Sequence, residues 1–323
     1  MDVTDGVPSA PKPVSVVASC GGLCNQLRVV LSYRIAAQKA GRHLYVKWSV
    51  CTACPAIDFN SLLEPIEGVD VCDTLLDLPE CYRFGRSPDM MITGYTASTH
   101  ISVLGTPTET QMYNVLRPLP SLQAKVDETV RACGPQFIAL HIRRTDHNFG
   151  NQTSDESFFA FVDANPELPI FLATDNSETQ SQFTARYGSR LRVLEAIQTP
   201  STNQPHLRRK SEVRHTPLDH AVVDLFTCVA ATVFKGSYFS SFSDTIMRLR
   251  QARGCAHADD DHDLSTPMWH RPTPYDMSFI IDGADASGRV TTRKPPGAPP
   301  MPKLVMREPD PMADPMAVPR SWQ

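Results

Sequence analysis

Two arginines and an aspartate follow an apolar run in the segment Ile138-Ala-Leu-His-Ile-Arg-Arg-Thr-Asp146. The run predicts a buried strand over residues 137–143, and the alternation of a strand places His141 and Arg143 on one face. A buried arginine is unfavourable unless it meets an anion, and a guanidinium binds phosphate oxygens through paired hydrogen bonds. Arg143 or Arg144 is therefore predicted to bind a diphosphate. An ion pair between Arg144 and Asp146 that only fixes the loop is the alternative.

A second apolar strand is predicted over residues 170–174, and it ends directly before Asp175. Ligands of α/β domains bind at the carboxyl ends of parallel strands, so this carboxylate is placed to accept hydrogen bonds from a sugar or an arginine. Aspartate is also a good N-cap for a helix. A cap on the helix predicted over residues 177–187 is the competing interpretation.

A carboxylate also lies inside the apolar helix predicted over residues 220–231, where Asp224 stands between Val223 and Leu225. A carboxylate in such surroundings is unfavourable unless it has a partner. A guanine base, which presents paired N–H donors, is one such partner. A nearby arginine is the alternative.

Hydroxyl groups gather before the helix predicted over residues 243–251, in the segment Gly236-Ser-Tyr-Phe-Ser-Ser-Phe-Ser243. Free backbone amides and the helix dipole make a helix start an anion site. Ser240, Ser241 and Ser243 lie at this start. One of the three is expected to be the helix N-cap, and the others remain for a phosphate.

A glycine-rich turn, Gly21-Gly-Leu-Cys-Asn-Gln26, precedes the helix predicted over residues 23–40. It brings Gly22 and Asn25 to the end of the strand predicted over residues 14–19. The turn lacks the lysine and the following hydroxyl residue of an ATP-binding phosphate loop, which excludes that function.

The sequence predicts no metal site. Cys51 and Cys54 form a CxxC motif, but no second pair follows at zinc-site spacing. His257 and the acidic run 259–263 have metal-ligand chemistry, yet their surroundings favour a solvated acidic linker.

Alternating strands and helices indicate an α/β fold with two doubly wound domains. The expected organisation is a flexible leader (1–13), an N-terminal domain on the acceptor side (14–120), a C-terminal domain that binds the donor (121–254) and a Pro-rich, disordered tail (255–323). The net charge of −4 and pI near 6.2 exclude a general nucleic-acid binder, so phosphate recognition must be local.

No apolar run is long enough to predict a membrane span. The acidic, Pro-rich start lacks the basic and apolar parts of a signal peptide. The chain as written is therefore expected in the cytoplasm, and in a lumen only if an N-terminal anchor is missing.

The order of these segments resembles the fucosyltransferase superfamily that includes the alpha-1,6-fucosyltransferases and the protein O-fucosyltransferases. Matching stretches span about residues 14–250, and they read GGLCNQLRVVLSYRIAAQKAGRHLYVKW, ALHIRRTD, FLATDN and DLFTCVAATVFKGSYFSSFS. The resemblance implies two facing Rossmann-like domains of the GT-B type. It also implies a metal-independent, inverting transfer of fucose from GDP-fucose to a glycan or protein hydroxyl, without a further cofactor.

The resemblance assigns the site residue by residue. Arg143 grips the donor diphosphate and stabilises GDP as it leaves, while His141 lies by the nucleotide and Asp224 holds the guanine or ribose edge. The remaining donor-binding positions are Gly22 and Asn25 from the first domain, and Arg144, Asp175, Ser240 and Ser241 from the second.

One departure concerns the general base. The alpha-1,6 enzymes carry a lysine and a glutamate shortly after the RRTD stretch, where this chain has His147 and, roughly, Asn151 or Gln152. The base is therefore not carried over, and Asp146 and Glu156 are local candidates. A catalytically silent GDP-sugar-binding protein, or a transferase of another GDP-sugar, remains an alternative.

Overall fold

The computed structural model describes residues 14–18, 22–39, 43–48, 59–72, 90–93, 101–102, 111–144, 153–197, 217–238, 240–261, 279–284 and 290–293. The leader, the CxxC motif and Asp146 lie outside these residues. So do His147, Asn151 and Gln152. The described part is mixed α/β with parallel sheets, as predicted.

The first sheet has four parallel strands in the order β3-β2-β1-β4, and the predicted strand–helix–strand unit forms its centre. Its elements are β1 (Val14–Ala18), α1 (Leu23–Lys39), β2 (His43–Lys47), β3 (Val69–Cys72) and β4 (Met90–Thr93). The apolar residues of α1 recur at helical spacing, so Leu27, Val30 and Leu31 are buried.

The second sheet has four parallel strands in the order β8-β7-β6-β9. They are β6 (Ile138–Ile142), β7 (Ile170–Thr174), β8 (Leu191–Arg192) and β9 (Val233–Gly236). All residues of β6 and β7 are buried, as expected for a parallel sheet covered on both faces. The helices of this half are α3 (Pro120–Cys133), α4 (Asp155–Asp163), α5 (Ser177–Tyr187), α6 (Leu218–Ala230) and α7 (Ser241–Ala252).

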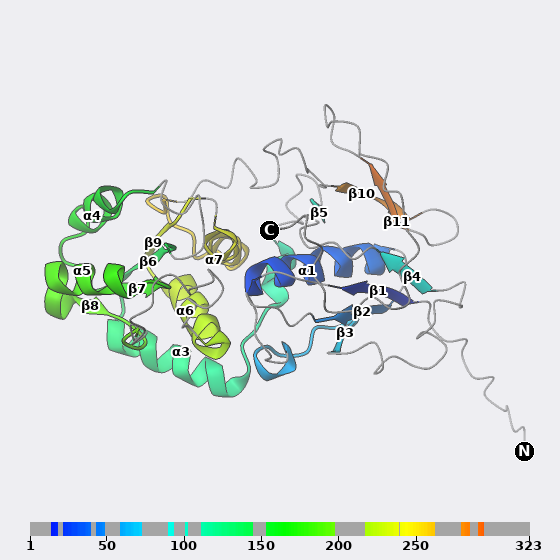
Figure 1. Ribbon diagram of the computed structural model, residues 1–323, viewed down its shortest axis with the longest axis horizontal. Coiled ribbons are helices and arrows are strands. Elements are labelled where there is room, and N and C mark those ends of the chain that lie inside the picture. Colours follow the sequence, from blue (N-terminus) through cyan, green and yellow to red (C-terminus); the bar gives the residue numbers. More distant parts are fainter. Residues whose placement is uncertain are drawn as a thin grey trace, which may run out of the picture.

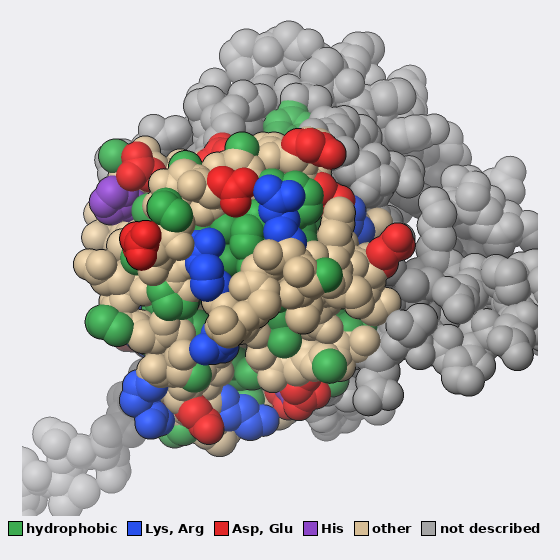
Figure 2. Space-filling view, turned by 90° about the vertical axis from the view of Figure 1, so that its left-hand side faces the viewer, with side chains coloured by type: hydrophobic (Ala, Val, Ile, Leu, Met, Phe, Trp, Pro, Cys, Tyr) green, Lys and Arg blue, Asp and Glu red, His purple; other side chains and the backbone are tan. Residues whose placement is uncertain are grey.

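The two parallel sheets lie in opposite halves of the molecule, and α1 begins beside α7 where the halves meet (Figure 1). Short 3-10 helices add local turns at η1 (Phe59–Ser61), η4 (Met112–Val115) and η6 (Gly188–Arg190). On the face formed by the second half, acidic and basic side chains are interspersed (Figure 2).

A third sheet joins β5 (Ile101–Ser102) to two strands from the predicted tail, β10 (Phe279–Ala284) and β11 (Val290–Arg293). β10 runs parallel to β5 and antiparallel to β11. These two strands lie in the tail that was expected to be disordered, so that expectation is wrong for their residues. Disorder in the rest of the tail stays a prediction.

The acidic run after α7 is not a solvated linker, and that prediction is wrong for Asp260 and Asp261. The Phe234 amide donates to Asp260 Oδ1 at 2.7 Å, and the Asp261 amide donates to the Phe234 carbonyl at 2.8 Å. Asp261 also forms an ion pair with the buried Lys235. Residues 260–261 therefore continue the packing of the second half beyond α7.

Arg250 of α7 is completely buried, and it closes the end of α6. Its guanidinium forms a two-pronged ion pair with Asp260, with Nε–Oδ2 and Nη2–Oδ1 both at 2.9 Å. It also donates to the carbonyls of Val229 at 3.0 Å, Thr232 at 3.1 Å and Cys255 at 3.0 Å. The last carbonyls of a helix lack partners within the helix, so one side chain here stabilises the α6 terminus, α7 and the following segment.

Replacing Arg250 with methionine is expected to lower the free energy of unfolding by about 3–5 kcal/mol, because Asp260 would remain buried without its counter-charge. Urea denaturation followed by circular dichroism measures the change. Arg186→Met is the control, since Arg186 pairs with Asp163 at 3.0 Å on the surface and surface pairs contribute little. Equal stability of the two variants would contradict the assigned role of Arg250.

Candidate active site

Arg143 and Asp175 meet at the carboxyl edge of the second sheet. Ile142 at the end of β6 pairs with Thr174 at the end of β7, so the next residues lie side by side. Arg143 Nη1 is 3.0 Å from Asp175 Oδ2, and the two side chains are only 15% and 9% exposed. The carboxylate thus fixes the guanidinium at the edge where the sequence predicted a ligand.

Asp175 is not the helix cap that competed for its role, so that interpretation is wrong. Its Oδ1 accepts from the Arg144 backbone amide at 2.9 Å, and the neighbouring Asn176 caps α5 by accepting from the Thr179 amide at 2.8 Å. Both residue types are good caps, and the chain uses the one nearer the helix.

The Arg144 guanidinium is engaged by the start of α4. Its Nη2 lies 2.7 Å from Asp155 Oδ1 and 2.9 Å from the Thr153 carbonyl, and its guanidinium carbon lies 5.8 Å from the Phe158 ring centre. The alternative to diphosphate binding was an ion pair between Arg144 and an aspartate that only fixes the loop. The structure shows an ion pair of this kind, with Asp155 as the partner. A role of Arg144 in donor binding stays a prediction.

His141 is joined to β9 and α7 through two buried serines. Its Nδ1 lies 2.7 Å from Ser243 Oγ, which also accepts from the Ser237 amide at 3.0 Å. Ser237 Oγ accepts from the Arg143 amide at 2.9 Å and donates to the His141 carbonyl at 3.1 Å. The His141 ring stacks on Phe242 with 4.5 Å between ring centres. Ser237 was not among the predicted site residues, because nothing in its own segment indicates a partner on β6.

Helix α7 begins at the same edge of the sheet, shortly after the end of β9. Ser240 is the N-cap, and its hydroxyl accepts from the Ser243 amide at 3.5 Å. The expectation that one of the three serines caps the helix is confirmed. The backbone amides at a helix start have no partner within the helix, which makes this turn suited to an anion.

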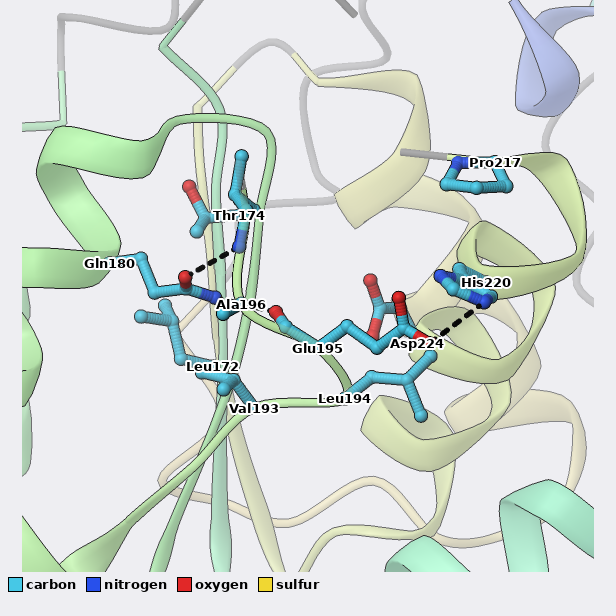
Figure 3. A pocket seen from close by; sticks show the side chains of 11 residues that line it. Leu172, Thr174, Gln180, Val193, Leu194, Glu195, Ala196, Pro217, His220 and Asp224 are labelled. Atoms are coloured by element: carbon cyan, nitrogen blue, oxygen red, sulfur yellow. Dashed lines mark hydrogen bonds and ion pairs between the residues drawn. The ribbon is translucent and has the colours of Figure 1, made fainter. Parts of the chain in front are cut away.

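A cavity of about 270 Å³ lies beside this edge, between β7, α6 and the segment after β8 (Figure 3). Apolar side chains form much of its wall, with Leu172 from β7 and Val193 and Leu194 after β8. The Gln180 side chain holds the segment after β8, since it donates to the Glu195 carbonyl at 2.9 Å and accepts from the Ile197 amide at 2.8 Å.

Asp224 lines this cavity from α6 and is 9% exposed. Within the described parts of the chain its carboxyl group has no hydrogen-bond or ion-pair partner, so the arginine alternative finds no support there. Burial raises the pKa of Asp224 to about 8. Glu195 and His220 lie at the same cavity, with 3.5 Å between Glu195 Oε1 and His220 Nε2. An unsatisfied buried carboxyl group in a cavity fits a ligand with N–H donors.

The predicted residues of the first half lie at the start of α1. The Gln26 amide donates to the Gly22 carbonyl at 3.1 Å, which begins the helix. Asn25 Oδ1 is buried and has no hydrogen-bond partner among the described residues. Arg28, in the second turn of α1, forms an ion pair with Asp244 in the first turn of α7 at 2.9 Å. The start of α1 therefore lies beside the start of α7.

Glu156, one of the two candidate bases, is exposed in the first turn of α4. Hydrogen bonds from its own backbone amide and from Ser154 lower its pKa. A weakly basic, exposed carboxylate is poorly suited to general-base catalysis near neutral pH.

Across the ranges that the structure describes, no three His, Cys, Asp or Glu side chains gather as a metal site, and no helix is long and apolar enough to cross a bilayer.

Comparison with solved structures gives this arrangement a fold class. The chain has a fucosyltransferase-like fold. Fucosyltransferase NodZ from Bradyrhizobium superposes with a TM-score of 0.51 at 15% identity, covering 80% of this chain and 97% of NodZ. NodZ soaked with GDP-fucose gives a TM-score of 0.50 at 14% identity, covering 88% of this chain and 100% of that one.

Protein O-fucosyltransferase POFUT1, solved in complex with GDP, gives a TM-score of 0.51 at 13% identity and covers 76% of this chain and 97% of that one. No protein-family model matches the sequence, and no curated protein matches it either. At these identities the likeness establishes the fold alone.

Replacing Asp224 with asparagine is expected to stabilise the protein increasingly as the pH rises. The folded pKa of about 8 lies above the ordinary value of 3.8, so the wild type loses stability between these two pH values and the variant does not. The gain is on the order of several kcal/mol near pH 8, and thermal melts across this window measure it. Asp219→Asn is the control on the same helix. Parallel stability profiles for wild type and Asp224→Asn would rule out the buried, unpaired carboxyl.

Proposed function

We propose that this protein is a glycosyltransferase with a GDP-sugar donor, and that the donor is GDP-fucose. The carrying observation is that one sheet edge brings together a fixed arginine, a free helix start and a cavity containing an unsatisfied carboxyl group. The fold supports the proposal, since it is shared with NodZ and POFUT1, which have been solved with GDP-fucose or GDP.

The cavity beside β7 is assigned to the guanine base. An ionised Asp224 accepts from the N1–H and the exocyclic amino group of guanine, a pair of donors that uracil does not present. The apolar wall of Leu172 and Val193 packs against the ring faces. This assignment gives Asp224 the hydrogen-bond partners that it lacks among the described residues.

The diphosphate is assigned to the sheet edge between Arg143 and the first turn of α7. The Arg143 guanidinium is held at this edge by Asp175 and has five N–H donors in a planar fork that suits phosphate oxygens. Ser241 adds a hydroxyl to the amides of α7. His141 shapes this turn through Ser243. Gly22 and Asn25 approach the donor from the start of α1, which the Arg28–Asp244 ion pair holds beside the start of α7.

The reaction is a single displacement at C1 of the sugar. The acceptor hydroxyl oxygen forms a bond to C1 while the bond from C1 to the β-phosphate oxygen breaks, which inverts the configuration. The hydroxyl proton passes to a base, and the bonding electron pair leaves with GDP. Arg143 and the α7 amides stabilise the charge that builds on the β-phosphate, without a metal ion; one well-placed donor of this kind contributes about 3–4 kcal/mol.

The acceptor is a glycan or protein hydroxyl. Asp146 remains the candidate base, because Glu156 has the exposure and lowered pKa of a weak base. Localisation in the cytoplasm, and an acceptor side formed by the first sheet, complete the proposal.

Calorimetric titration of GDP, GDP-fucose, GDP-mannose and UDP in the presence of EDTA tests the donor assignment. Binding of GDP and GDP-fucose with no response to UDP supports a metal-free guanine site. Equal binding of GDP-mannose with its turnover would favour another GDP-sugar, and GDP binding without release of fucose would favour a silent binding protein. No binding of any nucleotide would overturn the proposal.

Arg143→Ala is expected to lower donor turnover by about 100- to 1,000-fold, because it removes the fixed cation that meets the leaving phosphate. Arg143→Lys should recover only part of this loss, since lysine keeps the charge but not the planar fork. Arg192→Ala removes an exposed arginine from the edge strand β8 of the same sheet and serves as the control. Near-normal turnover by a folded Arg143→Ala protein would sink the assignment.

The affinity for GDP is expected to rise from about pH 6 to about pH 8, by up to roughly tenfold per pH unit. Asp224 is protonated below its pKa of about 8, and only the ionised carboxylate accepts both guanine donors. Titrations at a series of pH values measure this slope. Asp224→Asn should bind GDP weakly with a much flatter profile, whereas an unchanged slope in that variant would assign the titration to another group.

A further inference from the structure

One ion pair ties the two halves of the molecule together at the proposed donor site. Arg28 Nη2 of α1 and Asp244 Oδ2 of α7 are 2.9 Å apart, and their side chains are 3% and 4% exposed. The two residues are 216 positions apart in the chain. A buried pair at this distance fixes the relative placement of its two helices, because separating them would leave the buried Arg28 without its carboxylate.

Asp244 has a second guanidinium on the same oxygen. Arg248, one turn further along α7, places its Nε 3.0 Å from Asp244 Oδ2, and its guanidinium carbon lies 5.9 Å from the ring centre of Tyr113 in η4. Burial by itself lowers the pKa of Arg28, but Asp244 and Tyr113 more than offset this and the pKa is raised. Arg28 therefore stays charged, and residues of α1, α7 and η4 surround this ion pair.

The pair sits within one turn of both predicted phosphate-binding segments. Arg28 is three residues after Asn25, and residues three apart lie on the same face of a helix. The face of α1 that meets α7 is thus also the face of Asn25, whose buried Oδ1 has no partner in the described residues. On the other side, Asp244 directly follows Ser243, which contacts His141.

We propose that the Arg28–Asp244 ion pair is a positioning device that holds the starts of α1 and α7 together, so that Asn25 and the α7 amides act on one diphosphate. The inference rests on the proposed function and adds to it residues outside the predicted donor set. Arg28 and Asp244 do not touch the donor. They act through Asn25 and the first turn of α7.

Arg28→Met tests this with little disturbance of the charges, because Arg248 still compensates Asp244. Calorimetry is carried out with GDP and with guanosine on the full chain. We expect GDP affinity to fall about ten- to hundredfold, within the range of coupling between neighbouring groups, while guanosine affinity stays at the wild-type level. Arg248→Met is the matched control: it removes the other guanidinium of Asp244, leaves the tie between the helices, and should preserve GDP affinity.

The Asn25→Ala and Arg28→Met double variant separates positioning from a general effect on the fold. If Arg28 acts through Asn25, Arg28→Met adds little to the loss of GDP affinity in Asn25→Ala. Full additivity, unchanged GDP affinity in Arg28→Met, or equal losses for GDP and guanosine would each overturn the inference. If Arg28→Met does not fold, Arg28→Lys replaces it, with partial recovery expected and wild-type GDP affinity counting against the inference.

Failure of the inference and failure of the proposed function give different results. A wild-type chain that binds no GDP defeats the proposed function and the inference with it. A wild-type chain that binds GDP, with an Arg28→Met variant that binds it equally well, defeats the inference alone.

Discussion

The buried guanidinium of Arg250 sets the geometry on which the second half depends. Because an arginine without water must have all its donors satisfied, this side chain collects the end of α6, the end of α7 and Asp260 around itself. The relative placement of α6 and α7 then fixes where Asp224 enters its cavity and where the α7 amides open. Arg250, near the carboxyl-terminal ends of α6 and α7, thus helps to position the candidate site residues that lie further toward the amino-terminal ends of these helices.

The parallel sheets, and the meeting of Arg143 and Asp175 at one sheet edge, were within reach of the sequence. Apolar runs ending in Arg143 and Asp175 mark two strand ends, and parallel strands bring such ends to one edge. The partners of these residues were not predictable in the same way. Ser237 meets Arg143 across 94 positions and Arg28 meets Asp244 across 216, and no local pattern records such pairings. Asp175 and Asn176 are adjacent and equally good caps, so propensity did not separate them.

The acidic run after α7 shows a different limit. Composition predicted a solvated linker, because consecutive aspartates repel each other and favour water. Asp260 and Asp261 nevertheless pack against β9, since Arg250 and Lys235 supply buried counter-charges. Asp224 is the contrasting case, a carboxyl group that burial leaves without a partner among the described residues. Departures of this kind from local consistency are expected where a protein has a function to serve.

The third sheet has a mechanical consequence. The polypeptide leaves the first half after β5 to build the second, and β10 brings it back to pair with β5. Among the described elements, the chain therefore passes from the first half to the second after β5 and returns to the first half before β10. A single tether permits both bending and torsion, whereas two restrain torsion and leave bending about the line through them as the softest motion. Bending that carries α1 away from α7 would have to separate the buried Arg28–Asp244 ion pair, so this contact opposes the motion that the two crossings leave open.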